Sequence, residues 1–465
     1  MNRNPPTMSE MIMIGTNDAR CRGTRVEGAV PAVPAIPATL AMLALLGLGG
    51  CSGLLDVENP NSLVQDDLNS PAAAGALANG ALSTVARGYG EIVLLHGAAA
   101  DELKFTGSRD AWIQIQEGDL RDPANEFSDA AWPFVVEGRW MADEAVRLLS
   151  EFDQAGNLVN RNLLARAQLY SAMIYTQIAD IWEDFVLSDR TVAAPPRGPD
   201  NMLGLYDQAL QRLDAALAVT QATGNTELRA TVLAQRARTR HARAVRSRIT
   251  PAGTTPANPL VNEAAAVADA QAALALVSAD WRFRFTYSAN TVANSWGGWV
   301  NERLELRPSD SYVTPTANDK QVAAISLQDP IDGVPDPALS AIITEAVGAR
   351  QYGPVTVVSA RELRLILAEA ALASGSETGF AQQINLLRAA DGLSPWTGQI
   401  PAVEMLKHAR MAGLYMTGRR LNDHYRFGTT SPLWNPNAEA ARRPGTLFPI
   451  AEVERTSNCF VLGTC

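Results

Sequence analysis

Apolar residues recur at helical spacing through much of the chain. Between positions 163 and 181 they follow one another at steps of three or four, as Leu163, Ala167, Tyr170, Ile174, Ile178 and Ile181. This period places one apolar stripe on a single face of a helix. Similar alanine-rich stretches at 205–219, 233–245 and 263–277 predict further helices. Gly224-Asn225 interrupts the pattern between two of them, as a helical hairpin requires.

Start and stop signals frame other helices. Ser70-Pro71 is typical of a cap and first helical turn, so we expect a helix over 71–87. Two more are predicted in "SARELRLILAEAALASG" and "TGFAQQINLLRAADG", and a third around 402–415. The caps and terminators expected for the first two are Ser359, Gly375, Thr378 and Gly392. The fold class is therefore mainly α.

The small residues in these helices favour close helix packing. "DAALAV" at 214–219 and "QAALAL" at 271–276 share a pattern that suits stacked, tetratricopeptide-like helical pairs. A regular repeat of ~34 residues is missing, so alanine-rich composition explains the pattern equally well. We expect this scaffold at about 128–277 and 359–415. Residues 278–358 read as a loop-rich insertion with short strands, and 416–465 as a mostly irregular C-terminal segment.

The N-terminal pattern is that of an exported protein. The apolar run 39–48 is about half of the ~20 residues that span a bilayer, and arginines precede it. The sequence Leu48-Gly49-Gly50-Cys51 is similar to the lipobox of bacterial lipoproteins. That resemblance implies a signal peptide over 1–50, lipidation of Cys51 and a tether over 51–70, with Ser52 favouring the outer membrane. An ordinary secretory peptide with an incidental cysteine is the alternative.

The net charge limits the classes of possible binding partner, and the cysteines permit a disulfide. The net charge of −10 argues against nucleic acid, whose phosphates are also negative. We expect the arginine run at 236–248 to be a solvated helix face that pairs with neighbouring acids, rather than a site for an anionic partner. Cys459 and Cys465 permit a small disulfide loop in an oxidising compartment, although their spacing does not require one.

The sequence carries few signs of catalysis. Its histidines are isolated, as His96, His241, His408 and His424, which argues against a metal site. Phosphate-binding, dinucleotide and nucleophile-elbow patterns are missing. We therefore predict no catalytic residue, no metal and no cofactor. A glycosidase carboxylate pair cannot be recognised from sequence, so a lipid-anchored hydrolase stays open as an alternative.

Three stretches of the C-terminal half carry distinctive motifs, "RELRLILAEAALASG…FAQQINLLRAADG", "GRRLNDHYRFG" and "LFPIAEVERTSNC". Read together, they resemble the SusD/RagB family of outer-membrane nutrient-binding lipoproteins, and "LLDVENPNSL" after Cys51 also fits. The matching positions are Ala368, Glu369, Ala370, Ile384, Asn385, Arg388, Gly418, Arg420, Asp423, Arg426, Gly428, Pro449, Ile450, Glu452 and Asn458. Ala409 and Thr417 stand where the family usually has acids, which marks a divergent member and puts a salt bridge there in doubt.

The resemblance implies a binding protein and not an enzyme. Such a lipoprotein sits on the cell surface as a lid over a TonB-dependent (SusC-like) barrel, captures oligosaccharide or peptide ligands, and releases them into the transporter. Its fold is mostly helical, with tetratricopeptide-like pairs as scaffold and irregular insertions on the ligand face. A tetratricopeptide-type scaffold lipoprotein that organises envelope proteins is the main alternative.

Aromatic residues in the loop-rich insertion are the candidate ligand contacts. Indole rings pack on the flat faces of sugars, and nearby polar groups bind hydroxyls. Trp296 and Trp299 lie in a glycine-containing loop near Asn294, Asn301 and Arg303. Weaker candidates are Trp112, Trp281 and Tyr312. Burial between lobes is the alternative for all of these rings, and the positions predicted as core are Trp132, Trp140 and Trp182.

Overall fold

The computed structural model describes residues 68–189 and 192–465. The predicted signal peptide over 1–50, the lipidation of Cys51 and most of the predicted tether lie outside these residues. Within them, no helix combines the length and the apolar character needed to cross a membrane.

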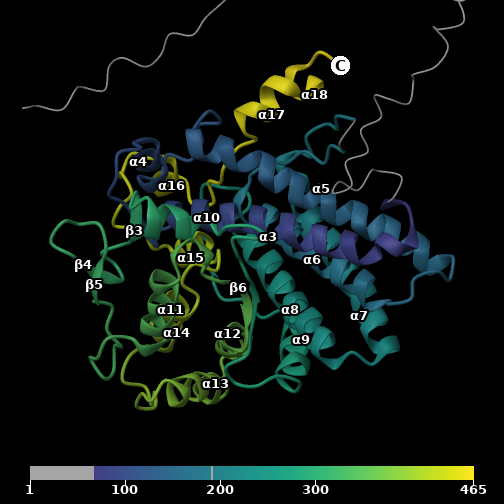
Figure 1. Ribbon diagram of the computed structural model, residues 1–465. Helices are drawn as coiled ribbons and strands as arrows, with labels where there is room; N and C mark the ends of the chain where they lie inside the picture. The colour runs from purple at the N-terminus through teal and green to yellow at the C-terminus, as the bar shows by residue number, and fades with distance from the viewer. Residues whose placement is uncertain (1–67, 190–191) are drawn as a thin grey trace, which may run out of the picture. The chain divides into compact units, whose positions relative to one another are not determined.

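Long helices packed on their sequence neighbours build most of the structure. Their bounds are α3 (Ala74–Ala99), α5 (Glu126–Gln154), α6 (Asn162–Ile181), α7 (Leu203–Thr223), α8 (Thr226–Arg248) and α9 (Ala264–Leu274). Helix α3 packs on α5 and α6, and α6 to α9 then follow one another side by side (Figure 1). Gly224, in the left-handed conformation, ends α7, and the Asn225 side chain caps α8. The mainly α prediction is confirmed.

Helix α3 is longer than expected. Ser70 caps its first turn, the 3-10 helix η1 (Pro71–Ala73), as predicted, but the helix continues to Ala99 instead of ending near 87. Its second half is buried on all sides, so it lacks the amphipathic stripe that reveals a surface helix. A Cβ on Gly88 would lie 2.8 Å from the Phe134 carbonyl oxygen, so glycine there permits the close approach of α5.

A second helical group follows the loop-rich insertion. It comprises α12 (Ala360–Ala373), α13 (Glu377–Ala390), α14 (Ala402–Gly413) and α15 (Arg420–Phe427). Ser359 caps α12 and the left-handed residues Gly375 and Gly392 follow the ends of α12 and α13, as predicted. The predicted N-cap Thr378 is wrong: the Ser376 side chain accepts the Gly379 N–H and caps α13 instead. The C-terminal segment adds the short helices α16 (Glu439–Arg442), α17 (Glu452–Ser457) and α18 (Cys459–Leu462).

The insertion contains short strands, as expected, and also one regular helix. The antiparallel pairs are β1 (Leu103–Phe105) with β3 (Leu306–Pro308), β2 (Arg282–Phe285) with β6 (Val355–Ser359), and β4 (Val313–Pro315) with β5 (Val322–Ile325). Short turns complete it: α10 (Ser295–Gly297), the π-helical turn η3 (Gly298–Glu302) and the 3-10 turn η4 (Arg350–Tyr352). Strand β1, the short helix α4 (Ala111–Gln116) and the 3-10 turn η2 (Pro199–Asn201) lie outside the insertion in the sequence. Helix α11 (Pro337–Gly348), capped by Asp336, was not predicted.

The arginine-rich helix α8 is only partly the solvated face predicted. Arg236 and Arg240 both pair with Asp269, as expected for surface guanidinium groups beside acids. Arg238 and Arg246, however, are buried. Arg238 pairs with Glu362 and donates to the Thr417 carbonyl. One helix therefore carries guanidinium groups both at the surface and in the core.

Three of the residues that carry the family resemblance, Glu369, Asp423 and Arg426, form a buried ionic network with Arg410 and His241. Glu369 accepts hydrogen bonds from Arg426 and from the Val261 N–H (2.8 Å), and His241 lies 3.0 Å away. Although burial acts to raise it, the charges of Arg426, His241 and Arg410 hold the pKa of Glu369 well below its usual value. Breaking a buried pair leaves an uncompensated charge, so this network serves the fold.

The two acidic positions that the chain lacks are replaced by other contacts. Arg410, next to Ala409, forms a bidentate pair with Asp423 at 2.8 and 3.1 Å. At the other position, the Thr417 hydroxyl donates to the Leu414 carbonyl. Near Ala409 an ion pair forms with Asp423 as the acidic partner, whereas the Thr417 side chain makes a local hydrogen bond to the backbone.

Candidate functional site

Three aromatic rings from distant parts of the chain meet at the edge of the loop-rich insertion. Trp112 on α4 stacks on Phe127 at the start of α5, with ring centroids 3.9 Å apart and planes 9° from parallel. Trp299 in η3 contacts both rings edge to face, at 5.5 and 5.1 Å. Trp112 is 1% exposed and Trp299 is half-buried. We call Trp112, Phe127, Trp299 and Arg303 the Trp299 platform.

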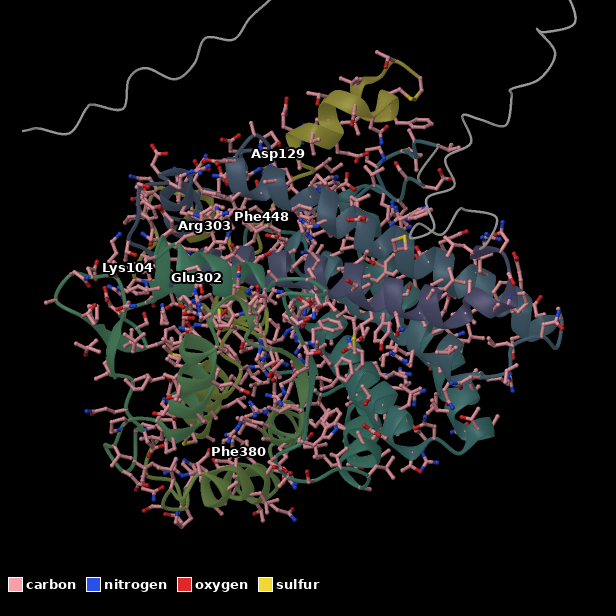
Figure 2. All side chains as sticks on the ribbon, viewed as in Figure 1. Lys104, Asp129, Glu302, Arg303, Phe380 and Phe448 are labelled. Atoms are coloured by element: carbon pink, nitrogen blue, oxygen red, sulfur yellow. A yellow bond between two sulfur atoms is a disulfide. The ribbon has the colours of Figure 1, made fainter. Side chains whose placement is uncertain are left out.

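Arg303 gives the platform a positive charge at the surface. Its guanidinium carbon lies 4.3 Å from the centroid of the Trp299 ring, and the side chain is exposed. Figure 2 shows Arg303 beside Glu302, which itself pairs with Arg350. A partly exposed indole beside a guanidinium group, which donates several hydrogen bonds, can pack against a sugar ring and bind its hydroxyls.

Backbone hydrogen bonds hold the platform in place. The Glu305 carboxylate accepts from the N–H groups of Ser108 and Arg109 at 2.6 and 2.9 Å. Although partial burial acts to raise it, these donors lower the pKa of Glu305. In addition, the Asn301 amide donates to the Ala346 carbonyl at 2.9 Å. The turn that carries Trp299 is therefore tied to both α4 and α11.

Three other predicted contacts are buried. Trp296 is 4% exposed, and Asn294, which is fully buried, donates to the Gly353 carbonyl at 2.8 Å. Tyr312 is also fully buried and packs edge to face on Tyr415. These positions fit the alternative left open by the sequence, packing in the core. A ligand role for them stays a prediction that no contact in the structure supports.

Trp281 lies apart from the platform, in a small cleft. The cleft has a volume of about 240 Å³ and lies among β2, β6, α11 and α14. It is also lined by the ion pair of Arg361 and Asp391, and by the buried Tyr415 and Thr417. Trp281 is half-buried and packs on a small core cluster. The predicted set of ligand residues therefore divides between two places.

One cluster of potential metal ligands exists in the described residues. Asp329, Asp336 and His408 bring ligand atoms within 4.8 Å of one another. Arg388 already binds the Asp329 carboxylate at 2.6 and 3.0 Å, and Asp336 caps α11 and contacts His408 at 2.9 Å. A cation would compete with the Arg388 guanidinium for Asp329. The cluster is therefore explained by hydrogen bonding.

The remaining predictions fare differently. Trp132 and Trp182 are core residues, as expected, at 2% and 0% exposure. The assignment of Trp140 to the core is wrong, because it is half-buried and lines a pocket beside α17. Cys459 and Cys465 form a disulfide with Cα atoms 5.0 Å apart.

Phe127 was missed by sequence reasoning. The signal that would have pointed to it is local: Asn125 caps α5 by accepting the Phe127 and Ser128 N–H groups, which fixes the ring at the first turn. Its packing against Trp112 and Trp299 depends on contacts between segments distant in the sequence.

Comparison with known proteins identifies the fold. No family model matches the sequence, and no curated protein matches it. Among solved structures, a SusD superfamily protein from Bacteroides thetaiotaomicron matches with a TM-score of 0.59 at 11% identity, over 84% of this chain and 98% of that one. A SusD homologue from the same species gives 0.54 at 13% identity, covering 84% and 96%. A SusD-like carbohydrate binding protein from Bacteroides vulgatus gives 0.53 at 13%, covering 85% and 98%. The chain thus has the fold of the SusD superfamily, as its sequence motifs predicted.

Proposed function

We propose that this protein is a cell-surface receptor that binds glycan fragments and passes them to a TonB-dependent (SusC-like) barrel of the outer membrane. The observation that carries the proposal is the Trp299 platform, a half-buried indole with an exposed guanidinium group over its ring. The fold supports it, because one protein that shares this fold is a SusD-like carbohydrate binding protein. The receptor is proposed to bind without catalysis, and a peptide ligand is the variant of the proposal to be tested.

The anchor belongs to the proposal as well. Lipidation of Cys51 would hold the receptor at the membrane surface, since each buried CH₂ of an acyl chain contributes about 0.8 kcal/mol and multiple chains anchor durably. Mass spectrometry of the native protein tests this part. A diacylglycerol-modified cysteine at position 51 is expected, and an unmodified thiol there contradicts it.

An array of oligosaccharides and peptides, probed with the purified full chain in mild detergent, tests ligand binding. The expected result is retention on a restricted set of glycans, with at least tenfold weaker binding for Trp299→Ala. Phe460→Ala is a suitable control, because Phe460 is an exposed aromatic residue at 45% on α18, outside the platform. Equal binding by Trp299→Ala and the wild type contradicts the platform, and retention on peptides alone contradicts the glycan ligand.

Transfer to a barrel is tested separately. Co-purification of the native protein in mild detergent is expected to recover a large β-barrel. Recovery of assembly factors without a barrel favours the scaffold alternative instead. Turnover of the bound glycan by the purified chain would show the hydrolase alternative and contradict a purely binding role.

A further inference from the structure

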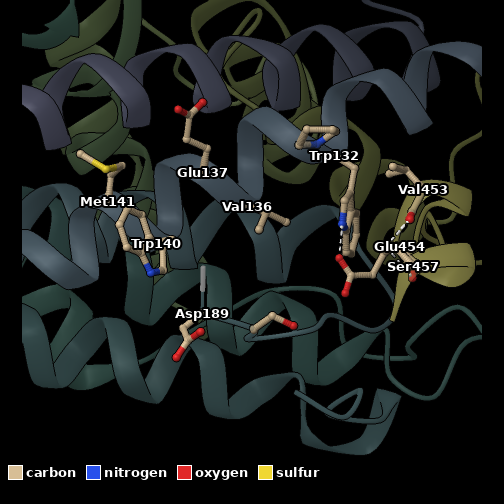
Figure 3. A pocket seen from close by; sticks show the side chains of 11 residues that line it. Trp132, Val136, Glu137, Trp140, Met141, Asp189, Val453, Glu454 and Ser457 are labelled. Atoms are coloured by element: carbon tan, nitrogen blue, oxygen red, sulfur yellow. Dashed lines mark hydrogen bonds between the residues drawn. The ribbon is translucent and has the colours of Figure 1, made fainter. Parts of the chain in front are cut away.

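A second aromatic pocket lies on the side of α5 that faces the C-terminal helix α17. Its volume is about 530 Å³, within the ~300–1,000 Å³ typical of small-molecule sites. The residues that line it are Trp132, Pro133, Val136, Glu137, Trp140, Met141, Ser188, Asp189, Val453, Glu454 and Ser457. None of them belongs to the Trp299 platform. Figure 3 shows side chains of α5 forming one long wall and those of α17 closing one end.

The floor of this pocket is rigid. Trp132 is 2% exposed and packs against Trp182 and Phe185, with ring centroids 5.7 and 4.7 Å away. Its indole N–H donates to the Glu454 carboxylate at 3.1 Å, which joins α5 to α17 (Figure 3). Asn458 also donates to Glu454, at 2.7 Å. These hydrogen bonds join the two walls of the pocket.

The open wall is apolar. Trp140 and Met141 are half-buried on α5, and Val136 lies between them and Trp132 (Figure 3). Val453 on α17, 39% exposed, is the apolar residue on the opposite side. An accessible indole beside a thioether is a surface on which the C–H face of a sugar ring can pack.

The polar atoms of the pocket are mostly hydrogen-bond acceptors. The carboxylates of Glu137, Asp189 and Glu454 line it, and no lysine or arginine is among its described lining residues. Two of its donors bond to other lining residues: Trp132 donates to Glu454, and the Ser457 hydroxyl donates to the Val453 carbonyl at 2.6 Å. The Trp140 indole N–H and the Ser188 hydroxyl also line the pocket. Glu137 is exposed and makes no hydrogen bond or ion pair with another described residue.

The carboxylates and apolar side chains that line the pocket favour a particular class of ligand. Hydroxyl groups donate hydrogen bonds to carboxylates, whereas the carboxylates of Glu137 and Glu454 would repel a uronic acid or a sulfated sugar. We propose that this pocket is a second saccharide subsite, specific for non-anionic sugar units. The inference rests on the proposed glycan-binding function and adds to it a selectivity that the positively charged Trp299 platform does not provide.

The closing experiment compares single variants of the full chain in calorimetric titrations. The probes are the neutral oligosaccharides retained on the array and an oligogalacturonate of similar length. Trp140→Ala is expected to weaken binding of neutral oligosaccharides at least tenfold, and Glu137→Gln severalfold. Phe134→Ala is the matched control, because Phe134 is a half-buried aromatic residue on the same helix that does not line the pocket.

The outcomes separate the two proposals. Unchanged affinity in Trp140→Ala and Glu137→Gln, with a wild type that binds neutral glycans, overturns the second subsite and leaves the proposed function intact. A wild type that binds no glycan overturns both. Preferential binding of oligogalacturonate that survives in Trp299→Ala also overturns the subsite. Circular dichroism and urea unfolding of each variant show whether a loss of binding reflects a loss of folding.

Discussion

The Trp299 platform and the aromatic pocket between α5 and α17 are built alike but charged differently. Each places a half-buried indole, Trp299 or Trp140, near a fully buried one, Trp112 or Trp132. The platform carries the exposed guanidinium group of Arg303, whereas the described lining of the pocket offers carboxylates and no basic residue. Under the two proposals above, the indoles supply a common apolar surface, while the charges around them set which ligand each surface would accept.

The largest expected effect tests whether the two buried indoles are structural. Trp112→Ala and Trp132→Ala should each lower the free energy of unfolding by about 3–5 kcal/mol, because both leave a large cavity in a packed interior. Replacing the half-buried rings, in Trp299→Ala and Trp140→Ala, should lower the free energy of unfolding by less, about 2 kcal/mol or below. Urea unfolding of the full chain measures all four. A loss for Trp299→Ala as large as that for Trp112→Ala would make Trp299 a core residue.

A pH-dependent effect on stability is expected from Glu102, on the platform side. Burial raises the pKa of Glu102 to about 8, against the hydrogen bond from the Met416 N–H at 2.7 Å. Glu102 precedes β1, which pairs with the β3 strand that follows Trp299. The folded state holds this proton above pH 4.5, where the unfolded chain releases it, so this group's contribution to stability falls as pH rises toward 8.

Unfolding measured at pH 5 and pH 8 checks this prediction. The contribution of Glu102 falls by up to about 1.4 kcal/mol per pH unit between its two pKa values. Glu102→Gln stays neutral throughout and should show a shallower decline than the wild type. Identical slopes in the two proteins would mean that Glu102 is ionised in the folded state.

An intermediate effect is expected at the joint between α5 and α17. Glu454→Ala removes the acceptor of the Trp132 indole N–H and of the Asn458 amide, so it should lower the free energy of unfolding by about 1–2 kcal/mol. Glu454→Gln keeps one acceptor oxygen and should lose less. Thermal or urea unfolding gives the values. Equal losses for the two variants would show that the charge of Glu454 matters more than its hydrogen bonds.

The smallest stability effect is expected for Arg303→Ala. An exposed cation–π contact contributes about 0.5–1 kcal/mol, so the free energy of unfolding should change by no more than this. Binding is the sharper measurement. Affinity for a carboxylate-bearing glycan should fall more than affinity for a neutral one, the reverse of the selectivity proposed for the pocket. Equal losses of affinity for both glycans would contradict the idea that the charge of Arg303 makes the platform prefer different ligands from the pocket.

The helices were predictable because their signals are local. The stripe from 163 to 181, the cap at Ser359 and the terminators Gly375 and Gly392 depend on residues within one or two turns. The end of α3 was missed because a helix buried on all sides shows no stripe. At α13, Ser376 and Thr378 are both competent caps, and only the backbone geometry distinguishes them.

The site residues were less predictable because their environment comes from distant segments. Trp296 and Trp299 share one short stretch, yet Trp296 is buried and Trp299 reaches the surface beside Trp112 and Phe127. Trp140 fits the helical period of a core residue, but the helix that it faces across the pocket lies more than 300 positions later. Periodicity indicates which face of a helix is apolar. It does not indicate where along the helix the neighbouring elements stop burying that face.

The disulfide-bearing end of the chain has a practical consequence for experiments. Residues 452–465 belong to a segment that the sequence predicts to be mostly irregular, yet α17 forms one end of the pocket. This helix is joined to α5 through Glu454 and through the Val453 N–H bound to Asp129 at 2.7 Å (Figures 2 and 3). Trimming these residues for crystallisation would remove one end of this pocket. A purification tag fused after Cys465 would extend from the same short helical end, so internal loops are the safer place for labels.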